Sequence, residues 1–201
     1  MKTINYENKH VIPSKIVCVG RNYVEHIEEL NNEIPKNMVL FNKPNSAISE
    51  NIEFISENTR FEGEICFLIE NKKLSAIGFG FDLTKKDIQE YLKSKGLPWE
   101  RAKAFNKSAI FSEFVKLDGD ISTIKMKLYQ NQKLQQFATY DLMIYKPQQI
   151  LEEILSFLDL EDNDIIMTGT PKGVNFYKKG DKFKAEIYIE NRLIIQKEWE
   201  V

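Results

Sequence analysis

The sequence predicts an α+β fold that is mainly β, with a few flanking helices. Three observations lead to this class. Short runs rich in branched apolar residues recur along the chain and end at glycine or proline. Residues 182–201 alternate apolar and polar side chains on both sides of Glu190, Asn191 and Arg192, which predicts a two-stranded hairpin. Few segments show the spacing of an amphipathic helix.

Three runs in the first third of the chain predict β-strands. "SKIVCVG" (residues 14–20) ends at a glycine, and "NMVLFNKP" (residues 37–44) ends at Pro44, whose ring does not continue a central strand. "EICFLIE" (residues 64–70) has five apolar residues in a row, which indicates a buried strand.

Two segments predict helices. In "LTKKDIQEYLKSKG" (residues 83–96), Thr84 is the expected N-cap and Gly96 the expected end of the helix. In "KPQQILEEILSFL" (residues 146–158), Pro147 suits the first helical position, and a stripe of Leu and Ile at helical spacing is expected to face the core.

Composition and charge limit the classes of protein. Of 201 residues, 42% are hydrophobic and 29% charged, as in ordinary globular proteins. The 28 basic and 30 acidic residues are mixed along the chain and give a net charge of -2, so a nucleic-acid partner is not expected. The start of the chain lacks the apolar core of a signal peptide, and no segment is apolar for long enough to cross a bilayer. These features predict a cytoplasmic protein without a membrane partner.

We expect one domain over residues 1–201. A small N-terminal lobe of residues 1 to about 48 is the alternative, because a Pro-Asn-Ser turn lies near its end. Cys18 and Cys66 both lie in apolar runs without an activating base nearby, which predicts buried packing residues rather than a catalytic thiol.

The stretch "RFEGEICFLIE" (residues 60–70) places two acidic residues at the mouth of the predicted buried strand. On a strand, Glu62 and Glu64 point to the same face, while Gly63 leaves the opposite face bare. Two such carboxylates are either solvated at an exposed strand end or hold a hard cation such as Mg²⁺, Mn²⁺ or Ca²⁺. Asp82 follows an apolar, glycine-containing run and precedes the first predicted long helix, so it is either a third ligand or a simple turn residue.

Six blocks together resemble the fumarylacetoacetate hydrolase family, and most closely its short acylpyruvase and oxaloacetate decarboxylase branch. They occur in the order of that family and cover nearly the whole chain. The blocks are "GRNYVEHIEE" (20–29), "LFNKPNSAI" (40–48), "FEGEICFLIE" (61–70), "FDLTKKDIQ" (81–89), "KGLPWERAKAFNKSA" (95–109) and "DIIMTGTPKGV" (164–174).

The resemblance implies a mixed β-roll fold, usually a homodimer, with one Mg²⁺ or Mn²⁺ in each active site. Its metal ligands fall on Glu62, Glu64 and Asp82 of this chain. The family's active-site lysine matches Lys103, whose surroundings in "PWERAKAF" are largely apolar, so its ammonium is expected to face a developing enolate or oxyanion.

Further catalytic residues are implied by the same blocks. His26 and Glu29 match a pair in which the carboxylate orients the imidazole to activate water. If "NYVEHIEEL" is helical, these two residues share one face; from spacing alone, a surface helix with scattered charges is the alternative. Gln89 matches a polar residue that supports the oxyanion.

Substrate contacts are expected in the loop "TGTPKGV", where Thr170 and the amides around Gly169 and Gly173 are candidate donors to a carboxylate. The loop lacks the spacing of a nucleotide phosphate loop. Arg21 and Lys43 are expected to add positive charge near the substrate.

Three positions depart from the family pattern. Lys86 stands where an arginine is common, which replaces a bidentate carboxylate clamp with a point charge. "FATYD" (residues 137–141) keeps only the threonine of a Gly-Asn-Thr-Ser string, and Asn175 replaces a second glycine.

The function implied is metal-dependent cleavage of a C–C bond in a small 2-oxo acid through an enolate. The reaction is acylpyruvate hydrolysis, oxaloacetate decarboxylation or both, with His26 and Glu29 activating water for hydrolysis. Two alternatives are an isomerase of an enolisable 2-oxo acid and a non-catalytic member of the fold that binds a small acid.

Overall fold

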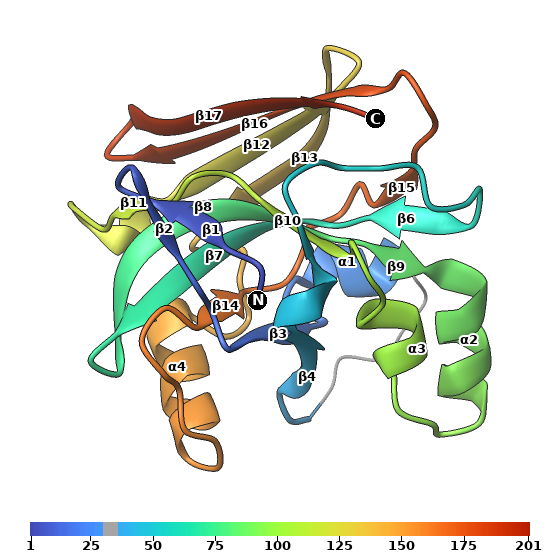
Figure 1. Cartoon of the computed structure of the whole chain (residues 1–201), viewed down its shortest axis with the longest axis horizontal. Helices are drawn as coiled ribbons and strands as arrows, with labels where there is room; N and C mark the ends of the chain where they lie inside the picture. The colour runs from blue at the N-terminus through green and yellow to red at the C-terminus, as the bar shows by residue number, and fades with distance from the viewer. Residues whose placement is uncertain (30–35) are drawn as a thin grey trace.

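The computed structural model describes residues 1–29 and 36–201, and all of these side chains except those of His26 and Glu28. The chain is built mainly of strands in two large sheets, with short helices around them (Figure 1). The α+β, mainly β prediction is confirmed.

The larger sheet is curled and has the strand order β4-β3-β14-β7-β8-β10-β5, with β11 pairing on β8. β7 lies between β14 and β8 and is buried along almost its whole length, which explains its run of apolar residues. The strands of this sheet are β3 (Lys15–Gly20), β4 (Val39–Pro44), β5 (Ile48–Ser49), β7 (Gly63–Glu70), β8 (Lys73–Asp82), β10 (Ala109–Phe111), β11 (Val115–Lys116) and β14 (Ile165–Met167).

A second sheet, with the order β13-β12-β16-β17, lies across the first (Figure 1). Its strands are β12 (Lys125–Gln130), β13 (Lys133–Thr139), β16 (Lys182–Ile189) and β17 (Arg192–Glu200). Two small sheets complete the strands: β1 (Ile4–Tyr6) with β2 (Lys9–Val11), and β15 (Asn175–Phe176) with β6 (Thr59–Phe61) and β9 (Thr84–Lys85).

The helices lie at the sides and below the large sheet in Figure 1. α4 packs its apolar face on β3 and β14, while α2 and α3 lie beside β9. The helices are α1 (Val24–Glu29), α2 (Lys86–Ser94), α3 (Glu100–Lys103) and α4 (Pro147–Leu155), with 3-10 turns η1 (Asn45–Ala47) and η2 (Ile121–Thr123).

Alternate side chains of the central strands enter different apolar clusters. Ile65 and Phe67 of β7 face the second sheet, where they join an aromatic cluster that includes Phe79, Phe81 and Trp199. Cys66 and Leu68, on the other face, pack with residues of β3, β10 and β14. Both faces of β7 are thus covered, and its position in the molecule is fixed by burial on two sides.

Most of the predicted elements are observed. The strands predicted at residues 14–20, 37–44 and 64–70 are β3, β4 and β7, and the predicted hairpin is β16 and β17. Its turn residues Glu190 and Asn191 both have positive φ, as a tight hairpin turn requires. The helices predicted around residues 84–96 and 146–158 are α2 and α4, and Pro147 occupies the start of α4 as expected. Cys18 and Cys66 are buried free thiols.

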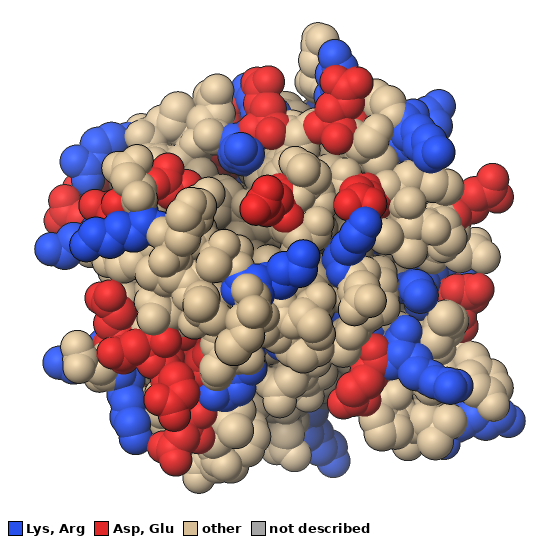
Figure 2. Space-filling view, in the orientation of Figure 1, with Lys and Arg blue, Asp and Glu red and all other residues tan. Residues whose placement is uncertain are grey.

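β3 and β4, from the N-terminal part of the chain, belong to the large sheet, since β3 pairs with β14 and β4 pairs with β3. Within the described part of the chain, no helix is both long and apolar enough to cross a membrane. Acidic and basic side chains are intermixed on the face seen in Figure 2, and no broad basic surface is visible there.

Candidate active site

Three carboxylates meet where β7 begins and β8 ends. In the antiparallel pairing of these strands, Gly63 lies opposite Phe81 and the amide of Asp82 donates to the carbonyl of Glu62 at 2.8 Å. Asp82 is therefore opposite Glu62, and Glu64, two residues further on, shares their face. One carboxylate oxygen from each lies within 4.8 Å of the others, and this is the only such acidic, His or Cys group found among the described residues.

The three carboxylates repel one another in a site with little solvent. Glu64 and Asp82 are both about 1% exposed. Burial raises the pKa of Glu64 well above its usual value, and the negative charges of Asp82 and Glu62 raise it further. A cation bound between the three groups would relieve this repulsion. Because all the donors are carboxylate oxygens, the set fits a hard divalent ion such as Mg²⁺ or Mn²⁺.

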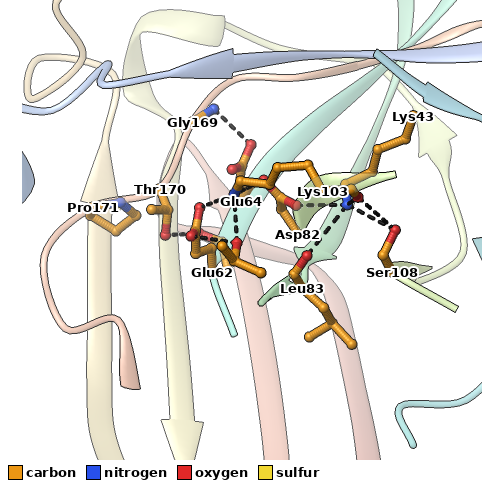
Figure 3. A network of polar contacts seen from close by, with 12 residues as sticks. Lys43, Glu62, Glu64, Asp82, Leu83, Lys103, Ser108, Gly169, Thr170 and Pro171 are labelled. Carbon is orange, nitrogen blue, oxygen red and sulfur yellow. Dashed lines mark hydrogen bonds and ion pairs between the residues drawn. The ribbon is translucent and has the colours of Figure 1, made fainter. Parts of the chain in front are cut away.

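Lys103, in the last turn of α3, is in contact with two of these carboxylates (Figure 3). Its ammonium lies 2.6 Å from Asp82 Oδ2 and 2.8 Å from Glu62 Oε2, and the side chain is almost fully buried. Burial by itself lowers the pKa of Lys103, but Asp82 and Glu62 outweigh it and raise the pKa above the usual value. Lys103 is therefore a fixed positive charge in this network.

Lys43, from β4, supplies a second buried ammonium on the opposite side of Asp82. It forms an ion pair with Asp82 Oδ1 at 2.8 Å and donates to Ser108 Oγ at 2.9 Å and to the carbonyl of Lys103. Its side chain has no exposed surface. Lys43 thus lies behind Asp82, where it offsets the buried negative charge.

Thr84 was expected to cap α2, and this prediction is wrong. Thr84 belongs to β9, and the N-terminal cap position of α2 falls on Lys85, which makes no capping hydrogen bond. The Thr84 hydroxyl instead donates to Glu62 Oε1 at 2.6 Å and accepts a hydrogen bond from Lys103 at 2.6 Å. The threonine therefore orients two predicted site residues, a role that a sequence pattern for helix caps does not reveal.

The face opposite the carboxylates at Gly63 is not bare, as the sequence had suggested, but closely packed. A Cβ at Gly63 would lie 2.8 Å from Leu128 and 2.9 Å from Gln136 Oε1. The Gly63 amide donates to that oxygen at 2.8 Å, and Gln136 Nε2 donates to Thr170 Oγ1 at 2.8 Å and to the Pro171 carbonyl at 3.0 Å. Gln136 of β13 therefore joins the start of β7 to the loop after β14.

The loop after β14 holds the third carboxylate. Its Gly169 amide donates to Glu64 Oε2 at 2.7 Å, and the Thr170 hydroxyl donates to the Gly63 carbonyl at 3.0 Å. Gly169 has a φ of +96°, and a Cβ there would lie 2.8 Å from Asn22 Cβ, so only glycine fits without displacement. The sequence predicted this amide as a donor to a substrate carboxylate, whereas in the structure it binds Glu64.

α1 meets the same loop from the other side. The Gly173 amide, also predicted to face a substrate, lies 3.2 Å from both carboxylate oxygens of Glu29. The predicted helical turn of "NYVEHIEEL" is confirmed by α1, which carries both His26 and Glu29. The side chain of His26 lies outside the described residues, so its pairing with Glu29 stays a prediction.

Arg21 is held at the end of β3 by an unusual backbone conformation. Its φ is +58°, in the left-handed region that costs a residue with a Cβ about 1 kcal/mol or more. Asn22, fully buried, fixes this turn: its side chain donates to the carbonyls of Thr168 at 2.7 Å and Tyr145 at 3.0 Å and accepts from the Tyr145 amide. The "GRNY" block thus encodes a locked turn that directs Arg21.

These elements surround a narrow cleft. Lys43, Glu64 and Gly169 are not among its lining residues, whereas Lys93 and Trp99, which the sequence did not single out as site residues, help to line it. The predicted site residues on the lining are Arg21, Glu62, Asp82, Gln89, Lys103 and Thr170.

Sequence reasoning missed several residues that shape this site. Lys93 follows Gln89 by four positions on α2, so helical spacing offered a signal for it. Gln136 and Ser108 offered none, because each reaches the site only through the tertiary fold.

Comparison with known proteins shows which family the chain resembles. A family model described as fumarylacetoacetate (FAA) hydrolase C-terminal matches residues 15–196. A mitochondrial oxaloacetate tautomerase from Bos taurus is 34% identical over 192 residues, which cover 86% of each chain. An oxaloacetate tautomerase from Escherichia coli is 33% identical over 188 residues, covering 84% of this chain and 86% of that protein.

A solved structure shows the same arrangement of the chain. The crystal structure of a putative fumarylacetoacetate isomerase/hydrolase from Oleispira antarctica has a TM-score of 0.92 and 32% sequence identity, with both chains covered completely. The expected β-roll fold is therefore confirmed. From the extent of the family match and from these relatives, the chain belongs to the fumarylacetoacetate hydrolase family.

Proposed function

We propose that this protein is a divalent-metal-dependent enzyme that acts on a small 2-oxo acid through an enolate, and that it interconverts the keto and enol forms of oxaloacetate. The observation that carries the proposal is the convergence of Glu62, Glu64 and Asp82 beside the buried ammonium of Lys103. The relatives named oxaloacetate tautomerase favour isomerisation over the C–C cleavage that the sequence blocks first suggested.

The three carboxylates are the residues that would hold the cation. A divalent ion at this position would act as a Lewis acid toward the keto oxygen of the substrate. The charge balance supports an anionic substrate: three carboxylates and the two ammonium groups of Lys43 and Lys103 leave one negative charge, and a divalent ion changes this to one positive charge. A carboxylic acid substrate complements that charge.

Lys103 is suited to stabilise charge rather than to remove a proton. Its ion pairs with Asp82 and Glu62 hold it in the ammonium form, which has no lone pair with which to act as a base. When a proton leaves the carbon next to the keto group, negative charge develops on the oxygen, and a fixed ammonium nearby stabilises it. The Thr84 hydroxyl restricts the position of that ammonium.

The proton transfers require a different group. Gln89 of the cleft wall does not titrate, so it can only donate or accept hydrogen bonds. α1 carries His26 and Glu29, and the contact of Glu29 with Gly173 holds this helix against the loop that contains Thr170. We assign the movement of the proton between carbon and oxygen to this pair.

A second candidate is cleavage of a C–C bond, either hydrolysis of an acylpyruvate or decarboxylation of oxaloacetate. It passes through the same kind of enolate, and hydrolysis needs in addition an activated water. This candidate is supported by α1, which carries both members of the pair expected to activate water, His26 and Glu29, and which Glu29 holds against the loop after β14.

The test uses chelator-treated protein to which Mg²⁺ or Mn²⁺ is added back. Enol oxaloacetate is followed by its ultraviolet absorbance, pyruvate release is followed with lactate dehydrogenase, and loss of acetylpyruvate is followed directly. We expect metal-dependent acceleration of enol loss that greatly exceeds pyruvate release. Fast pyruvate release from oxaloacetate or acetylpyruvate would favour the second candidate.

The same experiment separates an enzyme from a non-catalytic small-acid-binding protein. Metal-dependent binding of oxaloacetate with no change in any of the three reactions would contradict an enzymatic function. Lys103→Met is a useful variant here, because it removes the ammonium from the cleft but leaves the three carboxylates in place.

A further inference from the structure

Lys93 is the second ammonium group that reaches the cleft from the α2–α3 region. It lies in the last turn of α2, one helical turn after Gln89, and both side chains line the cleft. Its Nζ lies 5.1 Å from the ring centroid of Trp99, at the start of α3. A cation in this position over an indole ring is held by the ring's negative face.

Two aromatic rings and two ammonium groups form one wall. Trp99 is tilted against Phe41 with 5.8 Å between ring centroids, and Lys103 Nζ lies 5.2 Å from the Phe41 ring. The ammonium of Lys93 thus lies at one end of this aromatic pair and that of Lys103 at the other. Lys103 faces the carboxylate cluster, whereas no contact within 4 Å between Lys93 and a carboxylate is found in the described part of the chain.

Arg21 brings a third cation to the same cleft. Burial lowers the pKa of Lys93, and the nearby positive charge of Arg21 lowers it further. The locked turn at Asn22 fixes the backbone from which Arg21 extends. Two cationic side chains that line one cleft attract an anionic ligand to it.

The first lysine of α2, Lys86, is paired with another residue and lies outside the cleft. Lys86, at the position where an arginine clamp is common in the family, forms an ion pair with Glu90 at 2.9 Å on the same helix. It is not among the residues that line the cleft. The positive charge available on α2 for a substrate is therefore at Lys93.

We propose that Lys93, together with Arg21, binds the second carboxylate of a 2-oxo dicarboxylic acid and so makes this chain prefer such acids to 2-oxo monocarboxylic acids. The inference rests on the proposed function, which places the first carboxylate and the keto oxygen at the Glu62, Glu64 and Asp82 end of the cleft. A four-carbon acid then extends along the aromatic wall toward Lys93. Lys93 is in this sense the residue that determines substrate specificity.

The experiment compares oxaloacetate with 2-oxobutyrate, which has a methyl group where oxaloacetate has its second carboxylate. The variants are Lys93→Gln, which removes the charge, Lys93→Arg, which keeps it, and Lys86→Gln, a matched control on the same helix. With Mg²⁺ present, KM and kcat are measured for oxaloacetate, and the Kd of 2-oxobutyrate is measured by titration calorimetry. Circular dichroism confirms that each variant is folded.

We expect Lys93→Gln to raise the KM for oxaloacetate about tenfold or more, since a charge-assisted hydrogen bond is lost. Its kcat and the Kd of 2-oxobutyrate should change less than about threefold. Lys93→Arg should restore most of the affinity, and Lys86→Gln should match the wild type in every measurement.

Three results would overturn the inference: an unchanged KM in Lys93→Gln, an equal loss of affinity for both acids, or the same effect in Lys86→Gln. The outcome also separates this inference from the proposed function. If the wild-type protein neither binds nor converts oxaloacetate with metal present, both are wrong. If the wild type is active and Lys93→Gln is indistinguishable from it, only the role of Lys93 is wrong.

Discussion

Replacement of Gln136 by leucine tests whether the second sheet positions the carboxylate cluster. Gln136 is 1% exposed, accepts from the Gly63 amide and donates to Thr170 Oγ1 and to the Pro171 carbonyl. Leucine has a similar size and fills the same space, but it can make none of these hydrogen bonds. The change therefore isolates the polar contacts from the packing.

The expected loss of stability follows from the backbone groups that would lose a hydrogen-bond partner. The Gly63 amide and the Pro171 carbonyl would lose the partner they have on Gln136. Each buried backbone group without a partner costs about 1–3 kcal/mol, so the free energy of unfolding should fall by about 2–6 kcal/mol. Gly63 lies between Glu62 and Glu64, so we also expect the affinity for Mn²⁺ to fall about 10–100-fold, as for other residues that orient metal ligands.

The assay combines urea unfolding of the metal-free protein with calorimetric titration of Mn²⁺. Gln196→Leu is the control, because Gln196 lies in the same sheet but is exposed, and we expect it to change stability by less than about 0.5 kcal/mol. If Gln136→Leu loses stability but binds Mn²⁺ as the wild type does, the positioning role is refuted. If its stability is unchanged, the hydrogen-bond argument itself fails.

Three further predictions concern the ion pairs and the catalytic assignment. Burial alone would raise the pKa of Asp164, but its bond with Lys15 at 2.6 Å and with the neighbouring donors keeps the pKa below its usual value. Asp164→Asn should therefore lower the free energy of unfolding at pH 7 by about 2 kcal/mol, and the difference from wild type should shrink as the pH falls below about 4, where the carboxylate of the unfolded chain takes up a proton before that of the folded protein does. Glu62→Gln should abolish Mn²⁺ binding in calorimetry without unfolding the chain, whereas Asp82→Ala should also cost about 3–5 kcal/mol in urea unfolding, because it removes the buried carboxylate that pairs with both Lys43 and Lys103. For the C–C cleavage candidate, His26→Ala should reduce acylpyruvate hydrolysis about 100-fold and oxaloacetate decarboxylation far less; equal losses would contradict water activation by this residue.

Local patterns were sufficient for much of the fold. β3, β4 and β7 followed from apolar runs, and the hairpin of β16 and β17 followed from alternation around a turn. Each of these signals depends on residues that are close in the sequence, and burial of one or both faces of a strand leaves a direct trace in the order of residues.

Thr84 shows where a local pattern misleads. A threonine three residues before an acidic residue is typical of a helix start, yet its hydroxyl binds Glu62 and Lys103. These partners lie 22 and 19 residues away in the sequence. Two charged partners in a buried site outweigh the gain from capping one helix turn, and nothing in the neighbouring residues reveals that competition.

The carboxylate cluster was suggested by local spacing at Glu62 and Glu64, but the place of Asp82 beside them depends on strand register. The amide donors of the loop after β14 were identified as donors, although in the structure two of them, Gly169 and Gly173, bind Glu64 and Glu29. Sequence predicts that a group can donate; only the fold decides which acceptor it meets.

The glycines of β8 are the physical link between fold and site. Gly80 lies opposite Glu64, and a Cβ there would lie 2.7 Å from Cys66 Sγ, while a Cβ at Gly78 would lie 2.8 Å from Phe114. β8 therefore packs in this register only because Gly78 and Gly80 have no side chain. A slip of one residue would move Asp82 to the opposite face of the sheet, away from Glu62. Cys66 thus contributes to the site by packing rather than by its thiol chemistry. The run "GFGFD" specifies more than a buried strand, because its glycines fix the register of β8 on β7 and so place the third carboxylate, Asp82.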